Sequence, residues 1–337
     1  MTLTAPPRRW LASILAFAVA LGLVAAAPSA AFAEPDEGHN QQLIQNLEAA
    51  ARGYVEAQEA LEISQANQAR LKKELAKVNA ELGPLRAEVG AIAAAAYTNG
   101  RLNAIGAMLT STSSDNFLAR ATMLEEITLR EDEALRRLTT LEAKAKADKE
   151  AIDAEAAIQQ AQSAEMKKRI SALELTLSKS GGRYASPDWL KVDAPRATPT
   201  KRNRDGTLPR ESASVKDPTG TGGSITPRTK HALDEAKRFG FTRYTKCWRT
   251  QSWGEHPKGR ACDFSSARGG FAGTATGGDR IYGDKLASFF IQNAKALGVL
   301  YVIWYRMIWV AGAGWHRYSG CCGAAAEHTN HVHLSMY

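Results

Sequence analysis

Histidine and aspartate, two of the usual ligands of a zinc ion, concentrate in two short segments near the end of the sequence. The first segment, HPKGRACD, runs from His256 to Asp263, and the second, HTNHVH, runs from His328 through His331 to His333. Of the seven histidines in the chain, four lie in these two segments. A catalytic zinc ion takes three protein ligands and leaves a fourth position for water. The two segments are therefore the candidate metal site.

The spacing within each segment allows its side chains to converge on one ion. His331 and His333 are two residues apart, so in a strand they share one face while Val332 points into the core. His256 and Asp263 are too far apart for one helical turn. We expect a tight loop at residues 257–259 to bring both of them to the same ion.

The pattern H-x-x-G-x-A-x-D followed by H-x-x-H-x-H resembles that of the LAS-type zinc metallopeptidases, which cut D-amino-acid peptides of bacterial peptidoglycan. These include D-alanyl-D-alanine carboxypeptidases, vancomycin-resistance dipeptidases and penicillin-insensitive murein endopeptidases. The resemblance covers residues 225–337. It implies a secreted peptidase with Zn²⁺ as cofactor that hydrolyses stem or cross-link peptides of peptidoglycan.

The resemblance also assigns roles to individual residues. It implies three zinc ligands: His256, Asp263 and His333. It implies that His331 donates to the developing oxyanion and that His328 is the general base. Glu327 is a rival for the base, one residue out of register.

Arg249 is the candidate substrate-binding residue on the same basis. Members of the family often place an arginine on the strand before the first motif, near the substrate carbonyl or carboxylate. Arg260 and a plain surface role for Arg249 are the alternatives. The family often has a serine two residues before its first histidine, where this chain has Gly254, so the substrate end of the site departs from the pattern.

Long helices are predicted for the segment 34–179, which is rich in Ala, Glu, Lys, Leu and Gln. Apolar residues recur at heptad spacing, which is typical of a coiled coil: Leu47, Tyr54, Leu61, Leu75 and Leu82, with Ala50, Ala57, Leu71, Val78 and Leu85 three residues later. Pro84 is expected to kink or interrupt the first helix. A predicted turn at residues 98–100 and a second helix from about Asn116 to Ser178 make an antiparallel hairpin.

The hairpin resembles the coiled-coil segments of bacterial cell-wall hydrolases, which regulate or tether a catalytic domain. The resemblance implies a membrane or cell-wall protein as its partner. A plain spacer or an oligomerisation coil is the alternative.

A small α+β domain with an antiparallel sheet is predicted for residues 225–337, after a flexible basic linker at 180–224 that is rich in Pro and Gly. Thr226 and Pro227 predict the start of a helix that ends near Phe239. A second helix is expected from Asp284 to Gly298. Strands are predicted at these ranges: 241–250, 299–305, 306–310 and 332–336.

Residues 1–33 have the pattern of a signal peptide. Arg8 and Arg9 precede an apolar run, and Ala31-Phe32-Ala33 is a small-x-small cleavage site. A retained membrane anchor is the alternative, because the run is about 18 residues long. Both alternatives predict a secreted or extracytoplasmic protein, and the resemblance to peptidoglycan peptidases implies that it is associated with the cell wall.

Four cysteines lie in the predicted domain: Cys247, Cys262, Cys321 and Cys322. An even number in an exported domain predicts disulfides. Neighbouring cysteines rarely bond each other, so we expect Cys321 and Cys322 each to bond Cys247 or Cys262. A cysteine metal site is the alternative, although the chain has no CxxC pair.

The net charge of +8 is unevenly spread, since residues 34–182 are net acidic and residues 183–337 are basic. An exported protein meets little nucleic acid, so anionic cell-wall polymers or lipid head groups are the expected attraction and no nucleic-acid partner is predicted. The alternative to a peptidase is a non-catalytic cell-wall-binding or regulatory coiled-coil protein that keeps a structural zinc site.

Overall fold

The computed structural model describes residues 41–110, 113–178, 186–191, 193–318, 320 and 323–337. The predicted signal peptide at 1–33 lies outside the described residues, as do Cys321 and Cys322. Within the described part of the chain, no helix is both long enough and apolar enough to cross a membrane.

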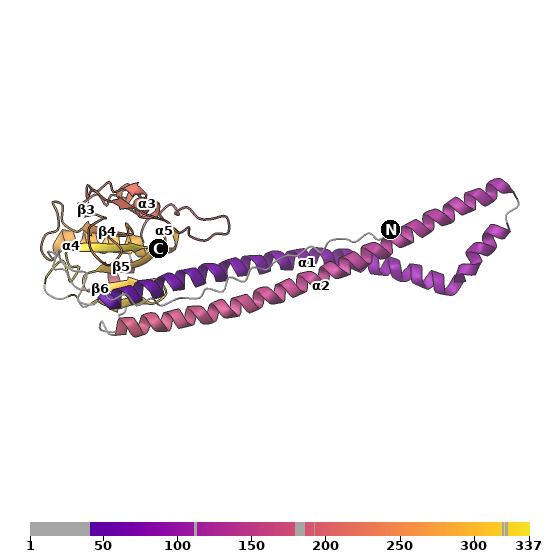
Figure 1. Ribbon diagram of the computed structural model, residues 1–337, viewed down its shortest axis with the longest axis horizontal. Coiled ribbons are helices and arrows are strands. Elements are labelled where there is room, and N and C mark those ends of the chain that lie inside the picture. Colours follow the sequence, from indigo (N-terminus) through magenta and orange to yellow (C-terminus); the bar gives the residue numbers. More distant parts are fainter. Residues whose placement is uncertain (1–40, 111–112, 179–185, 192, 319, 321–322) are drawn as a thin grey trace. The chain divides into compact units, whose positions relative to one another are not determined.

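Two long helices form the first part of the described chain, α1 (Gln41–Leu109) and α2 (Ser114–Ser178). They run side by side over much of their length (Figure 1). Val78 and Leu82 of α1 pack with Ala145 of α2 in a buried apolar cluster. The predicted all-α hairpin is therefore confirmed.

The tip of the hairpin differs from the expectation. Helix α1 continues through residues 98–100, where the sequence predicts a turn, and Pro84 does not end it. Helix α2 begins after Ser113, whose Oγ accepts a hydrogen bond from Asn116 N at 3.3 Å. A glycine costs a helix only about 1 kcal/mol relative to alanine. The alanine-rich turn before residue 98 can therefore carry the helix past the Asn-Gly pair.

A six-stranded antiparallel sheet forms the centre of the C-terminal domain. Its strands, in spatial order, are β3 (Thr245–Lys246), β4 (Ala261–Ser265), β8 (His331–Met336), β5 (Val299–Trp304), β6 (Met307–Val310) and β7 (Gly314–Arg317). Strand β8 lies between β4 and β5. This arrangement places the second histidine motif beside the first. The predicted α+β domain with an antiparallel sheet is confirmed.

Helices cover one face of this sheet: α3 (Pro227–Arg238), α4 (Gly277–Gln292) and α5 (Ala294–Leu297). Phe290 of α4 and Leu233 of α3 belong to one buried core with Val302, Val332 and Leu334 of the sheet. Burying each such side chain contributes roughly 1.5–3 kcal/mol. Side chains alternate along a strand, so the residues between these face the other side.

The opposite face of the sheet packs against the ends of the long helices. Tyr301 and Ile303 of β5 form a buried cluster with Ile44 and Leu47 of α1 and Leu173 of α2. The candidate metal ligands project from this same face, because Ile303 pairs with His333 across β5 and β8.

Several helices and strands begin or end at other residues than the sequence predicts. Helix α3 starts as predicted, with Thr226 as its cap. The helix predicted to begin at Asp284 begins at Gly277, and Asp284 instead accepts a hydrogen bond from Trp304 Nε1 at 2.7 Å. The strand predicted at 241–250 is reduced to β3, whereas the other three predicted strands correspond to β5, β6 and β8. Strands β4 and β7 were not predicted.

The segment predicted as a linker, residues 180–224, has little regular structure where it is described. It contains the short 3-10 helix η1 (Asp188–Lys191) and the two-stranded pair of β1 (Val215–Lys216) with β2 (Ser224–Ile225). Ala197 N donates to Asn293 Oδ1 at 2.8 Å, so this part of the segment packs on the domain. The boundary at residue 225 stays a prediction.

Cys247 and Cys262 form a disulfide with each other. The predicted bonds from these residues to the two later cysteines are therefore wrong. The register explains the difference. Lys246 of β3 pairs with Asp263 of the antiparallel strand β4, so Cys247, which follows Lys246, lies opposite Cys262, which precedes Asp263. The sequence does not reveal this register, since β3 is only two residues long.

Candidate metal centre

Two of the three predicted metal ligands lie on neighbouring strands. Asp263 of β4 pairs directly with His333 of β8, so their side chains project from the same face of the sheet. His333 Nδ1 lies 2.8 Å from Asp263 Oδ1. One strand pairing thus brings together two motifs that are 70 residues apart in the sequence.

His256 approaches the same place from the loop before β4. Gly259 N donates to His256 O and Arg260 N donates to Glu255 O, both at 2.9 Å, which confirms the tight loop predicted at this position. Gly259 has a φ of +69°, and a Cβ there would lie 2.6 Å from Ser224 O. Only glycine fits this turn without strain.

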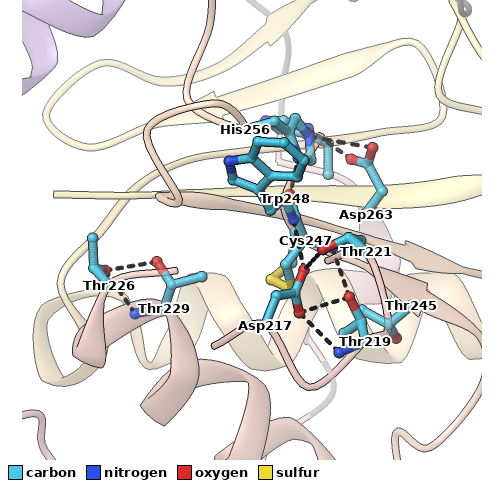
Figure 2. Close-up of a disulfide and its surroundings, with 12 residues drawn as sticks. Asp217, Thr219, Thr221, Thr226, Thr229, Thr245, Cys247, Trp248, His256 and Asp263 are labelled. Atoms are coloured by element: carbon cyan, nitrogen blue, oxygen red, sulfur yellow. Dashed lines mark hydrogen bonds and ion pairs between the residues drawn. A yellow bond between two sulfur atoms is a disulfide. The ribbon is translucent and has the colours of Figure 1, made fainter. Parts of the chain in front are cut away.

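The three side chains converge closely. His256 Nε2 lies 3.2 Å from Asp263 Oδ2 (Figure 2) and 3.3 Å from His333 Nδ1. One possible ligand atom from each residue lies within 4.8 Å of the others. The exposed fractions are 1% for His256, 4% for Asp263 and 0% for His333, so the group is buried as a unit.

Further hydrogen bonds determine which ring nitrogens face this centre. His256 Nδ1 contacts the carbonyl oxygen of Cys247, which can only accept, so Nδ1 carries the proton and Nε2 has a lone pair. His333 Nε2 lies 2.9 Å from Ser335 Oγ, which leaves Nδ1 directed at Asp263. Such second hydrogen bonds commonly orient histidine ligands.

The result is a buried group whose nitrogen and oxygen atoms face one another. The lone pair of His256 Nε2 and the carboxylate oxygens of Asp263 repel unless a proton or a metal ion lies between them. His333 Nδ1 completes two nitrogen donors and one oxygen donor, which suits zinc. The buried group therefore fits a metal ion with three protein ligands.

The carboxyl group of Asp263 is kept in its ionised form by its neighbours. Burial alone would raise the pKa of Asp263, but the protonated form of His256, the Arg249 guanidinium and the protonated form of His331 outweigh burial and hold it well below its ordinary range. Arg249 Nη1 donates to Asp263 Oδ2 at 2.6 Å. The structure thus places Arg249 at the site, against a candidate metal ligand, while its contact with substrate stays a prediction.

His331 lies on the same face of β8, with Nε2 3.6 Å from Asp263 Oδ1. Burial lowers the pKa of His331 to about 4, although Asp263 opposes this effect. Asn330 Nδ2 donates to Ala272 O at 2.7 Å, which turns the amide oxygen toward His331 Nδ1 at 2.7 Å. The neutral ring therefore carries its proton on Nδ1, and its Nε2 can accept a hydrogen bond.

His328 occupies the turn before β8. Its φ of +51° lies in the left-handed region, which is uncommon outside glycine and often marks functional positions. His328 Nδ1 lies 3.3 Å from Ala326 O, so Nδ1 carries the proton and Nε2 is the basic nitrogen. The ring centroid of His328 lies 4.6 Å from that of His331 and 5.0 Å from that of Tyr318.

Glu327, the rival base, is placed differently. Its carboxylate forms an ion pair with Arg306 at 2.6 Å, and the Arg306 side chain is 58% exposed. The two predicted catalytic histidines therefore lie together, and the glutamate is engaged at the surface.

Sequence reasoning missed three residues of this centre: Ser335, Asn330 and Tyr301. Ser335 continues the alternation of His331 and His333 along β8, so the spacing could have revealed it. Tyr301 stacks on His333 with ring centroids 5.5 Å apart. This contact crosses from β5 to β8, so no local pattern in the sequence indicates it.

Comparison with known proteins adds one match. A family model described as "VldE, C-terminal domain" matches residues 221–329, about a third of the chain. This range includes His256, Asp263 and His328 and ends before His331 and His333. No curated protein and no solved structure matches this chain significantly. The C-terminal domain is therefore similar over most of its length to the VldE C-terminal domain.

Proposed function

We propose that this chain is a secreted, zinc-dependent peptidase that hydrolyses the peptides of peptidoglycan. The observation that carries the proposal is the buried convergence of His256, Asp263 and His333 beside two histidines whose Nε2 atoms can accept protons. The substrate class rests on the resemblance of the two motifs to the LAS-type metallopeptidases. Export rests on the pattern of residues 1–33, and contact with the cell wall rests on the same resemblance.

The residues divide into a metal-holding set and a proton-transferring set. His256, Asp263 and His333 would hold zinc, which when bound supplies a Lewis acid and lowers the pKa of water to near 7. His328 accepts the proton of the attacking water at Nε2 and returns it to the leaving amine. The hydrogen bond from His328 Nδ1 to Ala326 O keeps the ring in the form that this role needs.

His331 stabilises the oxyanion of the substrate. Because its Nδ1 proton is directed at Asn330, it can donate from Nε2 only when the ring is protonated. Burial is the largest effect and lowers the pKa of the ring, whereas the charge of Asp263 favours the protonated form. Arg249, whose side chain is 24% exposed, lies where it can bind the carbonyl or carboxylate of an approaching peptide.

A second candidate function is a cell-wall-binding or regulatory protein with a structural zinc ion. The complete burial of His333 and the near-complete burial of His256 favour this candidate, because structural zinc sites are closed whereas catalytic sites keep an open position. In that case the hairpin would do the main work through a membrane or cell-wall protein partner.

Digestion of purified peptidoglycan separates the two candidates. The full-length chain is incubated with peptidoglycan with and without a chelator, and released muropeptides are analysed by mass. The peptidase predicts new fragments that disappear with chelator and return when zinc is added. Release of no fragment by a zinc-loaded chain would support the structural role instead.

A further inference from the structure

A buried carboxylate, Asp217, closes the turn between β1 and β2 next to the disulfide (Figure 2). It is 2% exposed. It accepts four hydrogen bonds, from Thr219 N (2.8 Å), Thr219 Oγ1 (2.7 Å), Thr221 Oγ1 (2.6 Å) and Trp248 N (2.8 Å). Burial would raise the pKa of Asp217, but these hydrogen bonds outweigh burial and lower it. Asp217 is therefore an anion with one donor from outside its own turn.

The peptide group between Cys247 and Trp248 connects this anion to the first candidate metal ligand. Its N–H donates to Asp217 Oδ2, and its carbonyl accepts a hydrogen bond from His256 Nδ1. Hydrogen bonds in such a chain polarise one another. The negative charge of Asp217 therefore makes the carbonyl a stronger acceptor and makes His256 Nε2 a better electron donor.

Two further contacts hold Cys247, the residue that supplies this carbonyl. Thr219 Oγ1 accepts a hydrogen bond from Cys247 N at 3.2 Å. The disulfide joins Cys247 to Cys262, which precedes Asp263 in β4. Cys247 thus contacts one candidate ligand through its carbonyl and is bonded to the neighbour of another.

We propose that Asp217 is a positioning residue of the metal centre, which acts through the Cys247–Trp248 peptide group to hold His256 with its proton on Nδ1 and to strengthen Nε2 as a ligand. Histidine ligands of metals commonly donate directly to a carboxylate or a carbonyl. Here the carboxylate is one peptide group further away. This inference rests on the metal centre proposed above.

The test compares two aspartates that make the same turn. Asp205 accepts hydrogen bonds from Thr207 N (2.9 Å) and Thr207 Oγ1 (2.6 Å), as Asp217 does from Thr219, but both partners lie in its own exposed turn. The zinc Kd of the full-length chain is measured by competition with a chromophoric chelator for Asp217→Asn and Asp205→Asn. We expect Asp217→Asn to weaken zinc binding roughly 10- to 100-fold and Asp205→Asn to leave it unchanged.

A spectroscopic signature separates positioning from general loss of stability. The visible absorption of the Co²⁺-loaded chain should shift in Asp217→Asn and stay the same in Asp205→Asn, because only the first changes the donor strength of a ligand. Equal zinc Kd values and equal spectra in the two variants would overturn this inference alone. If the unaltered chain binds no zinc, both the inference and the metal centre are wrong.

A measurement on the unaltered chain covers the case in which Asp217→Asn does not fold. Nitrogen-15 NMR of the metal-free chain reports which nitrogen of His256 carries the proton, and the signal is assigned by its loss in His256→Gln. We expect the proton on Nδ1. A ring protonated on Nε2 alone would contradict the inference.

Discussion

The helical hairpin and the C-terminal domain both bury polar side chains, but they use them differently. In the hairpin, Ser64 Oγ donates to Glu155 Oε2 at 2.5 Å, and Asp148 pairs with Lys144 one helical turn away at 3.0 Å. In the domain, Asp263 lies within 3.6 Å of side chains from three separate segments: Arg249, His256, His331 and His333.

This difference shows how a functional site can be recognised from packing. A buried polar group with a partner on the facing helix fixes how two helices pair, and one with a partner one turn away stabilises its own helix. Several titratable groups from distant parts of the sequence that converge on one carboxylate have no such simple structural purpose. Strongly shifted pKa values in such a cluster are typical of functional sites.

The comparison predicts that proton transfer belongs to one histidine of the domain. His328→Ala should reduce hydrolysis of peptidoglycan by about 10²- to 10⁴-fold, since it removes the general base, while bound zinc stays. Glu327→Gln is the matched control, because its carboxylate pairs with Arg306 at the surface. Measured release of muropeptides that depends on Glu327 and not on His328 would reverse the assignment.

The role of His331 can be separated from that of a base by two substitutions. Loss of one oxyanion donor costs about 10²- to 10³-fold in kcat, so we expect this loss for His331→Ala. His331→Gln offers an amide N–H without protonation and should recover part of kcat. Equal kcat values for the two variants, with zinc retained, would show that His331 does not act as a donor.

A substitution that destabilises the hairpin should leave the metal centre intact. Leu82→Ala removes a side chain that is 2% exposed in the seam between α1 and α2. We expect a loss of about 2–5 kcal/mol in the free energy of unfolding of the hairpin. Circular dichroism during a urea titration measures this loss. Leu129→Ala, at a position 63% exposed, is the control. A zinc Kd that changes with Leu82→Ala would mean that the two regions are coupled.

A smaller effect is expected where the two regions meet. Burial, and then the charge of Glu255, raise the pKa of Glu48 in α1 to about 7, although Lys258 opposes them. A raised pKa means that the folded state holds this proton more tightly than the unfolded state. The stabilisation is therefore full below about pH 4.5 and is lost as the pH rises through about 7.

Thermal unfolding at pH 5 and pH 8 tests this contact. The Tm of the unaltered chain should fall between these pH values by more than the Tm of Glu48→Gln, which cannot ionise. The same fall in both chains would show that Glu48 does not link the regions in this way.

The sequence predicts features that depend on local spacing. The heptad seam, the cap at Thr226, the loop at Gly259 and the shared face of His331 and His333 follow from residues close together in the chain. The pairing of Asp263 with His333 depends on a strand register, and no local pattern shows it. The motif resemblance nevertheless assigns both residues to one candidate metal site.

The failures have a common physical cause, since contacts between distant residues override local preferences. Asp284 is a good helix cap in isolation, but Trp304 takes its carboxylate as a hydrogen-bond acceptor. The predicted disulfide partner of Cys247 is wrong because the register of β3 against β4 determines which cysteine lies opposite it. The sequence does not indicate Asp217, because it lies in a segment whose composition is that of a linker and its donor from outside the turn is 31 residues away.

The central claim is that His256, Asp263 and His333 together hold one zinc ion. A calorimetric titration of the metal-free, full-length chain with zinc tests this most directly. We predict one tightly bound zinc ion per chain, lost in His333→Ala and retained in the control His231→Gln, a histidine of α3 that contacts Thr198 O. Unchanged stoichiometry and Kd in His333→Ala would contradict the account.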